Sequence, residues 1–350
     1  MRSEDGRALE RALVELGLPP EEAAAAVAED RVALAVVARM ARRTGPYTLD
    51  ELAERSGVPV WVLRERFRAL GVSEHARFGD DDVAEARLLA RMRTVVPDSA
   101  LVRVLRADAQ ALTRVALTHL EVAHDHFVIP VRREGGDDVA VALSLAEAHA
   151  SLREVAGELV ERSYHHLVDQ LLSSELVAAA TREEREQVVL AIGFADVVGY
   201  TSLSARIDPG GLEEVIEAFE SRCYAVAGLA PLVQLVKFLG DAAMFVSTDP
   251  QALAGALLDT VATPEDDSPL AGTPIRAALA CGPVTMRGGD YYGPTVNLAA
   301  RLVDRTRAGR VLAEESLADE LSGAFSLHRL PPMSLRGLRR HRPLVVRGRR

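Results

Sequence analysis

The feature that most constrains the fold is a change in the spacing of apolar residues near residue 185. Before it, apolar residues recur every three or four positions, which is the period of an amphipathic helix. After it, short apolar runs alternate with helical segments, and such runs need a sheet in which to be buried. The charged stretch REEREQ (182–187) separates the two patterns. We therefore predict an all-helical domain over 1–185, with linker helices at about 145–185, and a second domain over 186–350.

The second domain begins with a strand, a helix, two strands, a helix and a strand. The predicted strand runs are VVLAIGFADVV (188–198), LVQLVKFL (232–239), AAMFVST (242–248) and IRAALACGPVTMR (275–287). Gly240-Asp241 separates the middle two, which is a tight hairpin signal, and a further helix opens after Gly293-Pro294. We expect a ferredoxin-like βαββαβ domain of the α+β class, with its helices on one face of the sheet.

The composition limits the function classes. A length of 350 residues allows about two domains, and 48% hydrophobic and 26% charged residues are typical of a globular protein. A net charge of −10 argues against affinity of the whole chain for nucleic acid. The N-terminus MRSEDGR does not resemble a signal peptide, and no apolar run approaches the ~18 residues that span a bilayer. Two cysteines match neither a disulfide framework nor a zinc site. We expect a cytoplasmic protein with no membrane contact.

One lysine and one asparagine stand out in this composition. Lys237 is the only lysine beside 40 arginines, and Asn297 is the only asparagine. The residue bias is typical of a GC-rich genome, in which surface lysines drift to arginine. Lysine is a compact point donor, whereas arginine is a wide planar fork, so a retained lysine indicates a position that needs a point donor. The alternative is chance survival.

Two aspartates stand at the ends of predicted strands. Asp196 ends the buried run in FADVVGYTSLS, and Asp241 lies at the predicted hairpin tip. Carboxylates at neighbouring strand ends can hold hard cations such as Mg²⁺ or Mn²⁺ together with phosphate oxygens. Two such ions about 3.5–4 Å apart suit an in-line displacement at phosphorus. The alternative for each aspartate is a purely local role in its turn.

A third set of polar residues surrounds the helix predicted at 295–306. Asn297 and Arg301 are four residues apart and share a face near the start of the helix, where anions are favoured. An arginine there can fork onto a phosphoryl group. Asp290, in the loop predicted before the helix, can accept hydrogen bonds from an amino group. The alternative is that Asn297 is an ordinary residue at the start of a helix and that Arg301 is an exposed arginine.

Taken together, three stretches resemble the signature motifs of the class III nucleotidyl cyclases. FADVVGYT, VKFLGDAAMF and GGDYYGPTVNLAAR follow one another in the family's order, and the resemblance covers about residues 186–345. It implies two metal ions per site, Mg²⁺ or Mn²⁺, on two aspartates, a purine-reading Lys–Asp pair and a transition-state Asn–Arg pair. Matched one by one, these are Asp196 and Asp241, Lys237 and Asp290, and Asn297 and Arg301.

The resemblance implies an adenylyl cyclase, a phosphorus–oxygen lyase that converts ATP to 3′,5′-cyclic AMP and pyrophosphate. The ribose 3′-hydroxyl would attack the α-phosphorus in line at two metal ions. Lys237 would donate to adenine N1 and Asp290 would accept from N6, and guanine presents the reverse pattern. Guanylyl cyclase activity is therefore disfavoured. Family members build each site across a homodimer interface, so the two metal aspartates would come from one chain and the other four residues from its partner.

The N-terminal half suggests regulation. YTLDELAERSGVPVWVLRERFRALGV (47–72) predicts a helix-turn-helix-like unit similar to the N-terminal region of MerR-type regulators. DNA binding through Arg64, Arg66 and Arg68 is one reading. Residues 1–110 carry 17 Arg against 19 Asp and Glu, however, and a DNA-binding module is usually basic. We expect a packing unit rather than a DNA reader.

Histidines gather in the same half. Those before residue 185 are His75, His119, His124, His126, His149, His165 and His166. Histidine changes charge near pH 6–7, and the layout resembles actinobacterial cyclases whose helical autoregulatory domain responds to pH. Ordinary exposed histidines, or a small ligand in the helical half, are alternatives.

The alternative function for the whole chain is a DNA-binding regulator with a nucleotide-sensing, catalytically silent cyclase-like domain.

Overall fold

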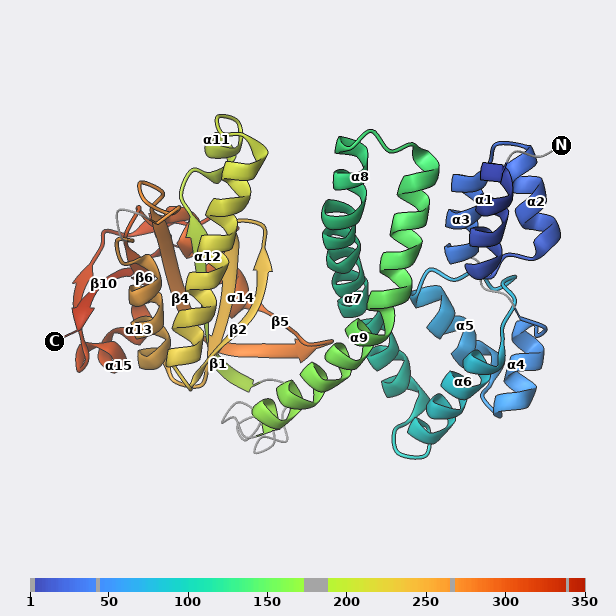
Figure 1. Ribbon diagram of the computed structural model, residues 1–350. Coiled ribbons are helices and arrows are strands. Elements are labelled where there is room, and N and C mark those ends of the chain that lie inside the picture. Colours follow the sequence, from blue (N-terminus) through green and yellow to red (C-terminus); the bar gives the residue numbers. More distant parts are fainter. Residues whose placement is uncertain (1–3, 42–44, 173–187, 265–267, 338–339, 350) are drawn as a thin grey trace. The chain divides into compact units, whose positions relative to one another are not determined.

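The computed structural model describes residues 4–41, 45–172, 188–264, 268–337 and 340–349 (Figure 1). The chain divides into two compact units, residues 1–164 and 165–350. The junction REEREQ and the domain boundary predicted at 185 lie outside the described residues. None of the described helices combines the length and the apolar character needed to cross a membrane.

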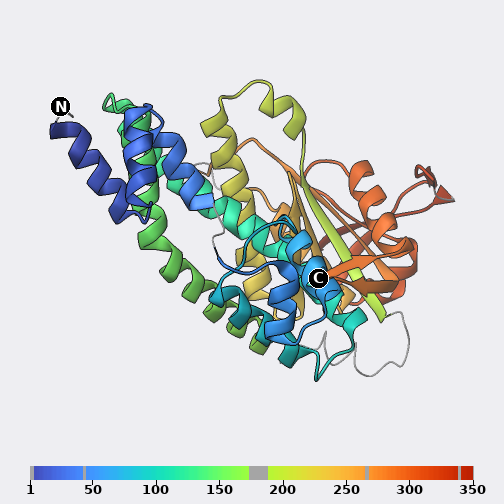
Figure 2. The same ribbon diagram turned by 90° about the vertical axis from the view of Figure 1, so that its right-hand side faces the viewer.

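The first unit is helical, as the apolar period predicts. Its described helices are α1 Glu4–Glu15, α2 Pro20–Ala28, α3 Val32–Ala41, α4 Leu49–Ser56, α5 Val60–Ala69, α6 Asp80–Met92, α7 Asp98–Ala123, α8 Ile129–Arg133 and most of α9 Asp138–Leu172, which continues past residue 164. One π-helical turn, His124–Val128, joins α7 to α8. Figure 2 shows α9 in green as a single long helix. One core lies among α1, α2, α3 and α9, and a second lies among α4, α5, α6 and α7.

Helices α4 and α5 form the predicted helix, turn and helix. Thr48 and Glu51 make a capping box at the start of α4. The helix ends at Gly57, whose φ of 71° is in the left-handed region that favours glycine. Pro59 then precedes α5. Local capping chemistry thus sets both ends of α4.

The second unit is a mixed sheet with helices. Its strands are β1 Val188–Val197, β2 Val233–Leu239, β3 Ala242–Ser247, β4 Ile275–Arg287, β5 Asp290–Tyr292, β6 Val311–Ala313, β7 Phe325–Arg329 and β10 Leu344–Arg349, with a separate small pair β8 Met333–Ser334 and β9 Arg340–His341. The order in the sheet is β2-β3-β1-β4-β6-β10-β7, and β5 pairs with β4. All neighbours are antiparallel except β4 and β6. The helices are α11 Tyr200–Ser204, α12 Pro209–Leu229, α13 Pro250–Val261, α14 Pro294–Arg305 and α15 Ala318–Ser322.

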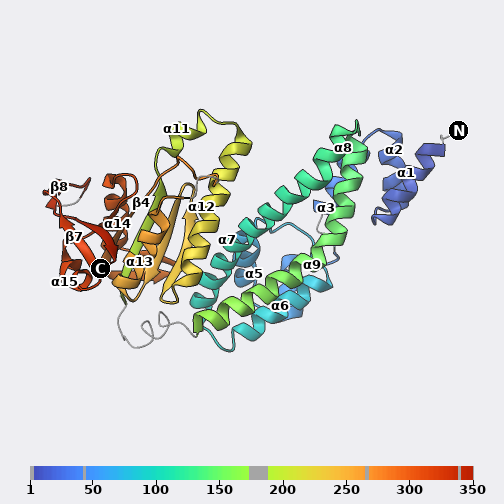
Figure 3. The ribbon, with the colours of Figure 1, turned by 60° about the vertical axis from the view of Figure 1, so that its left-hand side comes forward.

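Helices cover both faces of this sheet, and the prediction of helices on one face was wrong. Ala191 and Ala195 of β1 pack into a core with α12 and α13, while Ile192 and Phe194 pack into a second core with α14. Figure 3 shows α12 and α13 along one side of the strands. The sequence of β1 agrees with this arrangement, because a nearly continuous apolar run is typical of a strand that is covered on both faces.

Candidate active site

The two aspartates lie next to each other where the end of β1 meets the turn between β2 and β3. Asp196 is near the end of β1, where it pairs with Ala242 of β3, and the Val197 N–H donates to the Asp241 carbonyl at 3.0 Å. Asp241 follows Gly240, whose φ of 66° lets the hairpin turn. The hairpin therefore places Asp241 beside the end of β1.

Burial and nearby charge act on Asp196. Its side chain is 12% exposed. Burial raises the pKa of the Asp196 carboxyl, the Arg276 guanidinium lowers this pKa, and the carboxylate of Asp241 raises it further. Two mutually repelling carboxylates form an anionic site that a divalent cation would neutralise. No group of three or more His, Cys, Asp or Glu side chains suited to a metal occurs among the described residues. Two carboxylates nevertheless fit Mg²⁺, which takes one or two protein carboxylates plus phosphates and water.

Lys237 forms an ion pair with Asp290. Its Nζ donates to Asp290 Oδ2, and both side chains are about three-quarters buried, at 27% and 23% exposed. Asp290 Oδ1 accepts from the Tyr291 N–H at 2.8 Å. Both carboxylate oxygens of Asp290 thus accept a hydrogen bond. The only lysine of the chain contacts the aspartate with which the motif pairs it.

Asp290 begins a strand, where the sequence predicted a loop. β5 pairs with β4 through Asp290 and Arg287, Tyr291 and Met286, and Tyr292 and Thr285. Tyr291 is buried, and this burial together with Asp290 raises the pKa of its phenol. Pairing with β4 fixes the backbone of Asp290 and so aims its side chain at Lys237.

Helix α14 presents Asn297 and Arg301 to solvent. Both side chains are exposed, while Leu298 and Leu302 on an adjacent side of the helix are buried. The start of the helix is held by Thr295, whose Oγ1 donates to the Pro283 carbonyl at 2.9 Å. Asn297 and Arg301 therefore sit on an exposed helix face that is free to meet a ligand.

Arg276, which contacts Asp196 directly, could not be identified from the sequence. This residue of β4 lies opposite Asp196 in the strand pairing. Its Nε donates to Asp196 Oδ2 at 2.6 Å, and its Nη2 lies 2.5 Å from the same oxygen. One arginine among 40 carries no signal of its own, and only the register of β1 against β4 could have identified it.

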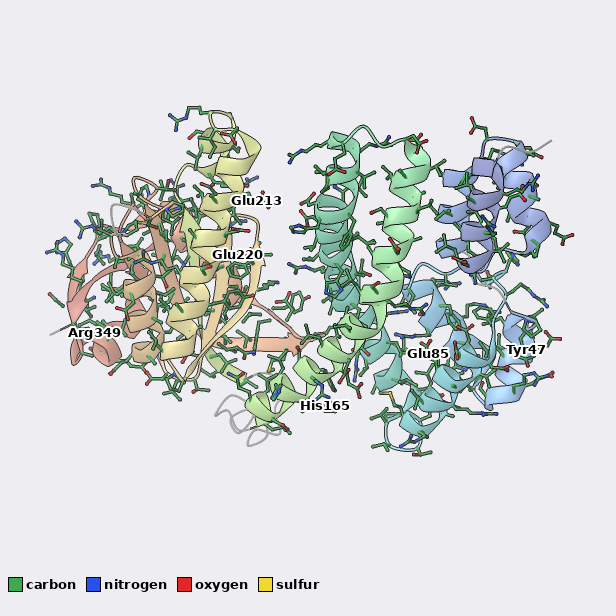
Figure 4. All side chains as sticks on the ribbon, in the orientation of Figure 1. Tyr47, Glu85, His165, Glu213, Glu220 and Arg349 are labelled. Carbon is green, nitrogen blue, oxygen red and sulfur yellow. The ribbon has the colours of Figure 1, made fainter. Side chains whose placement is uncertain are left out.

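The arginines of the helix-turn-helix-like unit are engaged by acidic partners. Arg64 Nε donates to Glu74 and Arg66 Nε to Glu85, each at 2.9 Å (Figure 4 labels Glu85). Arg68 Nη1 lies 3.3 Å from Glu65. Each of these three arginines therefore has an acidic partner within the same unit.

His124 and His126 lie in the π-helical turn between α7 and α8. Both are exposed, and His124 Nδ1 lies 3.1 Å from the Asp125 carboxylate. Ser144 Oγ of α9 donates to the Phe127 carbonyl of this turn at 3.0 Å. π-helical turns are rare and often mark functional positions.

Three actinobacterial relatives align with most of the chain. An uncharacterized protein of Mycobacterium tuberculosis (strain H37Rv) is 32% identical over 310 residues, which are 81% of this chain and 78% of the relative. A protein of Streptomyces coelicolor named adenylate cyclase is 29% identical and covers 84% and 76%. A protein of M. tuberculosis (strain CDC 1551) named pH-sensitive adenylate cyclase is 27% identical and covers 93% and 84%.

A solved structure of a rhodopsin-guanylyl cyclase catalytic core with converted specificity, in complex with ATPαS, is 24% identical. It covers 46% of this chain and 96% of its own, with a TM-score of 0.42. No protein-family model matches the chain.

Proposed function

We propose that this chain, which belongs to the actinobacterial class III adenylyl cyclase family, converts ATP to 3′,5′-cyclic AMP and pyrophosphate. The observation that carries the proposal is the ion pair between Lys237 and Asp290. It joins the two residues that the family motif assigns to the purine, on strands β2 and β5. The lysine can donate to adenine N1, and the aspartate can accept from the adenine N6 amino group. Guanine has a donor at N1 and an acceptor at O6, so it does not match this pair.

The chain's own residues bind and orient the substrate. Lys237 and Asp290 read the base, Asn297 holds the ribose, and Arg301 forks onto the α-phosphoryl group as charge develops there. The ribose 3′-oxygen bonds to the α-phosphorus, the bond from this phosphorus to pyrophosphate breaks, and the hydroxyl proton passes to solvent. Alignment of these atoms is the main contribution of a rigid site.

Asp196 and Asp241 are the residues that would hold two Mg²⁺ or Mn²⁺ ions. When bound, such ions lower the pKa of the attacking hydroxyl and neutralise charge on the triphosphate. The adjacent carboxylates and the absence of a third acidic ligand among the described residues agree with a site completed by phosphate oxygens.

The direct test measures cyclic nucleotide formation by the full chain with Mn²⁺ and either ATP or GTP. We expect cyclic AMP from ATP, little product from GTP, and none from Asp196→Ala. Lys237→Ala should narrow the preference for ATP over GTP. Absence of cyclic AMP at every pH from 5 to 8 would contradict the proposal and favour the nucleotide-sensing regulator.

The active protein should be a homodimer with two composite sites. In this arrangement, Asp196 and Asp241 of one chain face Lys237, Asp290 and Asn297 of the other, together with Arg301. Mixing Asp196→Ala chains with Asn297→Ala chains should restore activity, because one of the two sites in each mixed dimer is then intact. Two inactive variants that stay inactive after mixing would contradict the composite site.

The helical unit is proposed to regulate catalysis, with pH as the signal. The exposed histidines of the π-helical turn support this, since histidine changes charge near neutral pH. In the full chain, replacing both His124 and His126 by Asn should move the midpoint of the activity–pH curve. His328→Asn is the matched control, because His328 is an exposed histidine of the catalytic unit. Identical curves for all three proteins would remove these histidines from the mechanism.

A further inference from the structure

Arg276 is bonded to two parts of the active-site architecture at once. Through Nε and Nη2 it contacts Asp196 Oδ2 at 2.6 and 2.5 Å. Through Nη1 it donates to the main-chain carbonyl of Asp304 at 3.1 Å. The guanidinium therefore uses all three of its nitrogens, and its side chain is only 24% exposed.

The Asp304 carbonyl belongs to the last turn of α14. The last four carbonyls of a helix lack partners within the helix, and the C-terminal end attracts positive charge. Arg276 supplies both a donor and a charge there. Thr306 Oγ1 caps the neighbouring Leu302 carbonyl at 2.7 Å, so the end of α14 is fixed by two side chains.

The backbone on either side of Arg276 is also tied to the segment after α14. The Ala277 N–H donates to the Arg310 carbonyl at 3.0 Å, and the Gly309 N–H donates to the Ile275 carbonyl at 2.8 Å. Arg301, one turn before the end of α14, has its Nη1 3.6 Å from Asp304 Oδ2. A path of bonded groups thus runs from Asp196 through Arg276 to the end of the helix that carries Asn297 and Arg301.

We propose that Arg276 is a positioning residue that joins the cation-binding carboxylate Asp196 to helix α14 and thereby links the two active sites of the dimer. This inference rests on the proposed function, in which Asp196 serves one composite site while Asn297 and Arg301 of the same chain serve the other. Arg276 aims the Asp196 carboxylate for one site and holds α14 in place for the other.

The first experiment measures Mn²⁺ binding to the full-length protein without nucleotide, by electron paramagnetic resonance. Arg276→Lys keeps the charge but loses the planar fork, so a change in affinity reports geometry rather than charge. We expect Mn²⁺ affinity to fall by about 10- to 100-fold, the usual loss when a partner of a metal ligand is removed. Unchanged affinity would overturn the role at Asp196.

Arg222→Lys is the matched control for folding and stability. Arg222 Nη2 donates to the carbonyls of Asp259 and Ala262, at 3.0 and 2.7 Å, at the end of α13. The same substitution thus removes the same kind of helix-end contact away from the proposed site. Thermal unfolding compares the stability of the two variants. Arg222→Lys should bind Mn²⁺ with the same affinity as the protein without substitutions. If Arg276→Lys does not fold, Arg276→Gln takes its place and tests the loss of the contact and of the charge together.

The second experiment uses mixed dimers to separate the two roles. An Asp196→Ala chain paired with an Asn297→Ala chain leaves one intact site, which takes its aspartates from the Asn297→Ala chain and its α14 from the Asp196→Ala chain. Arg276→Lys placed in the Asn297→Ala chain should raise the Mn²⁺ concentration for half-maximal activity by about 10-fold or more. Placed in the Asp196→Ala chain, it should lower kcat at saturating Mn²⁺ and leave that concentration unchanged.

These outcomes are distinct from each other and from failure of the proposed function. If kcat is unchanged when Arg276→Lys lies in the Asp196→Ala chain, the link to α14 is wrong. Equal effects of both placements, scaling with the folded fraction, would indicate a purely structural residue and also overturn the proposal. If the protein without substitutions forms no cyclic AMP, the proposed function is wrong. The comparison of Mn²⁺ affinity between this protein and Arg276→Lys still decides the role of Arg276 at Asp196.

Discussion

At the residue scale, the rarity of a residue type was the main sequence signal for the candidate site. Lys237 and Asn297 were singled out because each is the only copy of its type, and Asp196 and Asp241 because each follows an apolar run. Their catalytic roles remain predictions. Arg276 could not be found in this way, because an arginine is common in this chain and its importance depends on which strand β4 faces.

The first prediction at this scale concerns Asp196→Asn. Asparagine has nearly the same shape and can still accept a hydrogen bond from Arg276, so far-UV circular dichroism should show an intact fold. It lacks the charge that attracts a cation, so cyclic AMP formation should fall by at least about 100-fold, the upper end of what a mere partner of a ligand contributes. Retention of more than a tenth of the activity would contradict a metal role for this carboxylate.

A second prediction follows from burial of the thiols. Burial, together with the nearby carboxylates of Glu320 and Glu314, raises the pKa of Cys281 to about 11, and burial raises the pKa of Cys223 to about 12. Only the thiolate is nucleophilic. At pH 8 both thiols of the folded protein should react with a disulfide reagent at least about 100-fold more slowly than free cysteine, whose pKa is about 8.5. The rate at Cys281 should rise about tenfold per pH unit up to pH 10, and fast labelling at pH 7 would contradict the protonated state.

At the element scale, strands that are long and apolar were predictable, and β5 was not. β1 to β4 lie within a residue or two of their apolar runs. β5 has three residues after a glycine pair and has no periodicity of its own, because its pairing partner β4 makes it a strand. Likewise, the sequence period shows that α14 has a buried face, but which side of the sheet it covers depends on tertiary packing.

The contact between β4 and α14 yields a prediction at this scale. A Cβ on Gly282 would lie 2.9 Å from Thr295 Oγ1, which holds the start of α14. Gly282→Ala should therefore displace the helix, lower the free energy of unfolding by about 1–3 kcal/mol and reduce cyclic AMP formation. Gly228→Ala in α12 is the control, because nothing lies within 4 Å of its added Cβ. Chemical denaturation would measure both, and equal stability of the two variants would contradict the clash.

At the scale of the whole molecule, each hydrophobic core belongs to one unit. The two cores of the catalytic unit draw on residues 188–346, and the two described cores of the helical unit draw on residues 13–146. The division into a helical part and a sheet part could be predicted from the sequence, because the apolar period changes. The signal that the helical part senses could not be predicted, because exposed histidines occur for many reasons.

This separation of cores predicts that residues 186–350 fold alone. The fragment should unfold cooperatively on heating, since it is only slightly larger than the single domains of up to about 150 residues that usually unfold in this way. If the helical unit regulates by pH, the fragment should form cyclic AMP with a different dependence on pH from that of the full chain. Superimposable pH curves would contradict regulation by this unit, whereas a fragment without cooperative unfolding would contradict the independence of the cores.

The solitary lysine also has a practical consequence. Every ε-amino group available to an acylating reagent in this chain belongs to Lys237, whose side chain is about a quarter exposed and held by Asp290. A fluorescent acyl label on an ε-amine would therefore mark the Lys237–Asp290 pair without any engineered attachment point. If this pair reads the purine, as proposed, incorporation of the label would slow as ATP binds, and the chain would carry its own chemical probe of nucleotide occupancy.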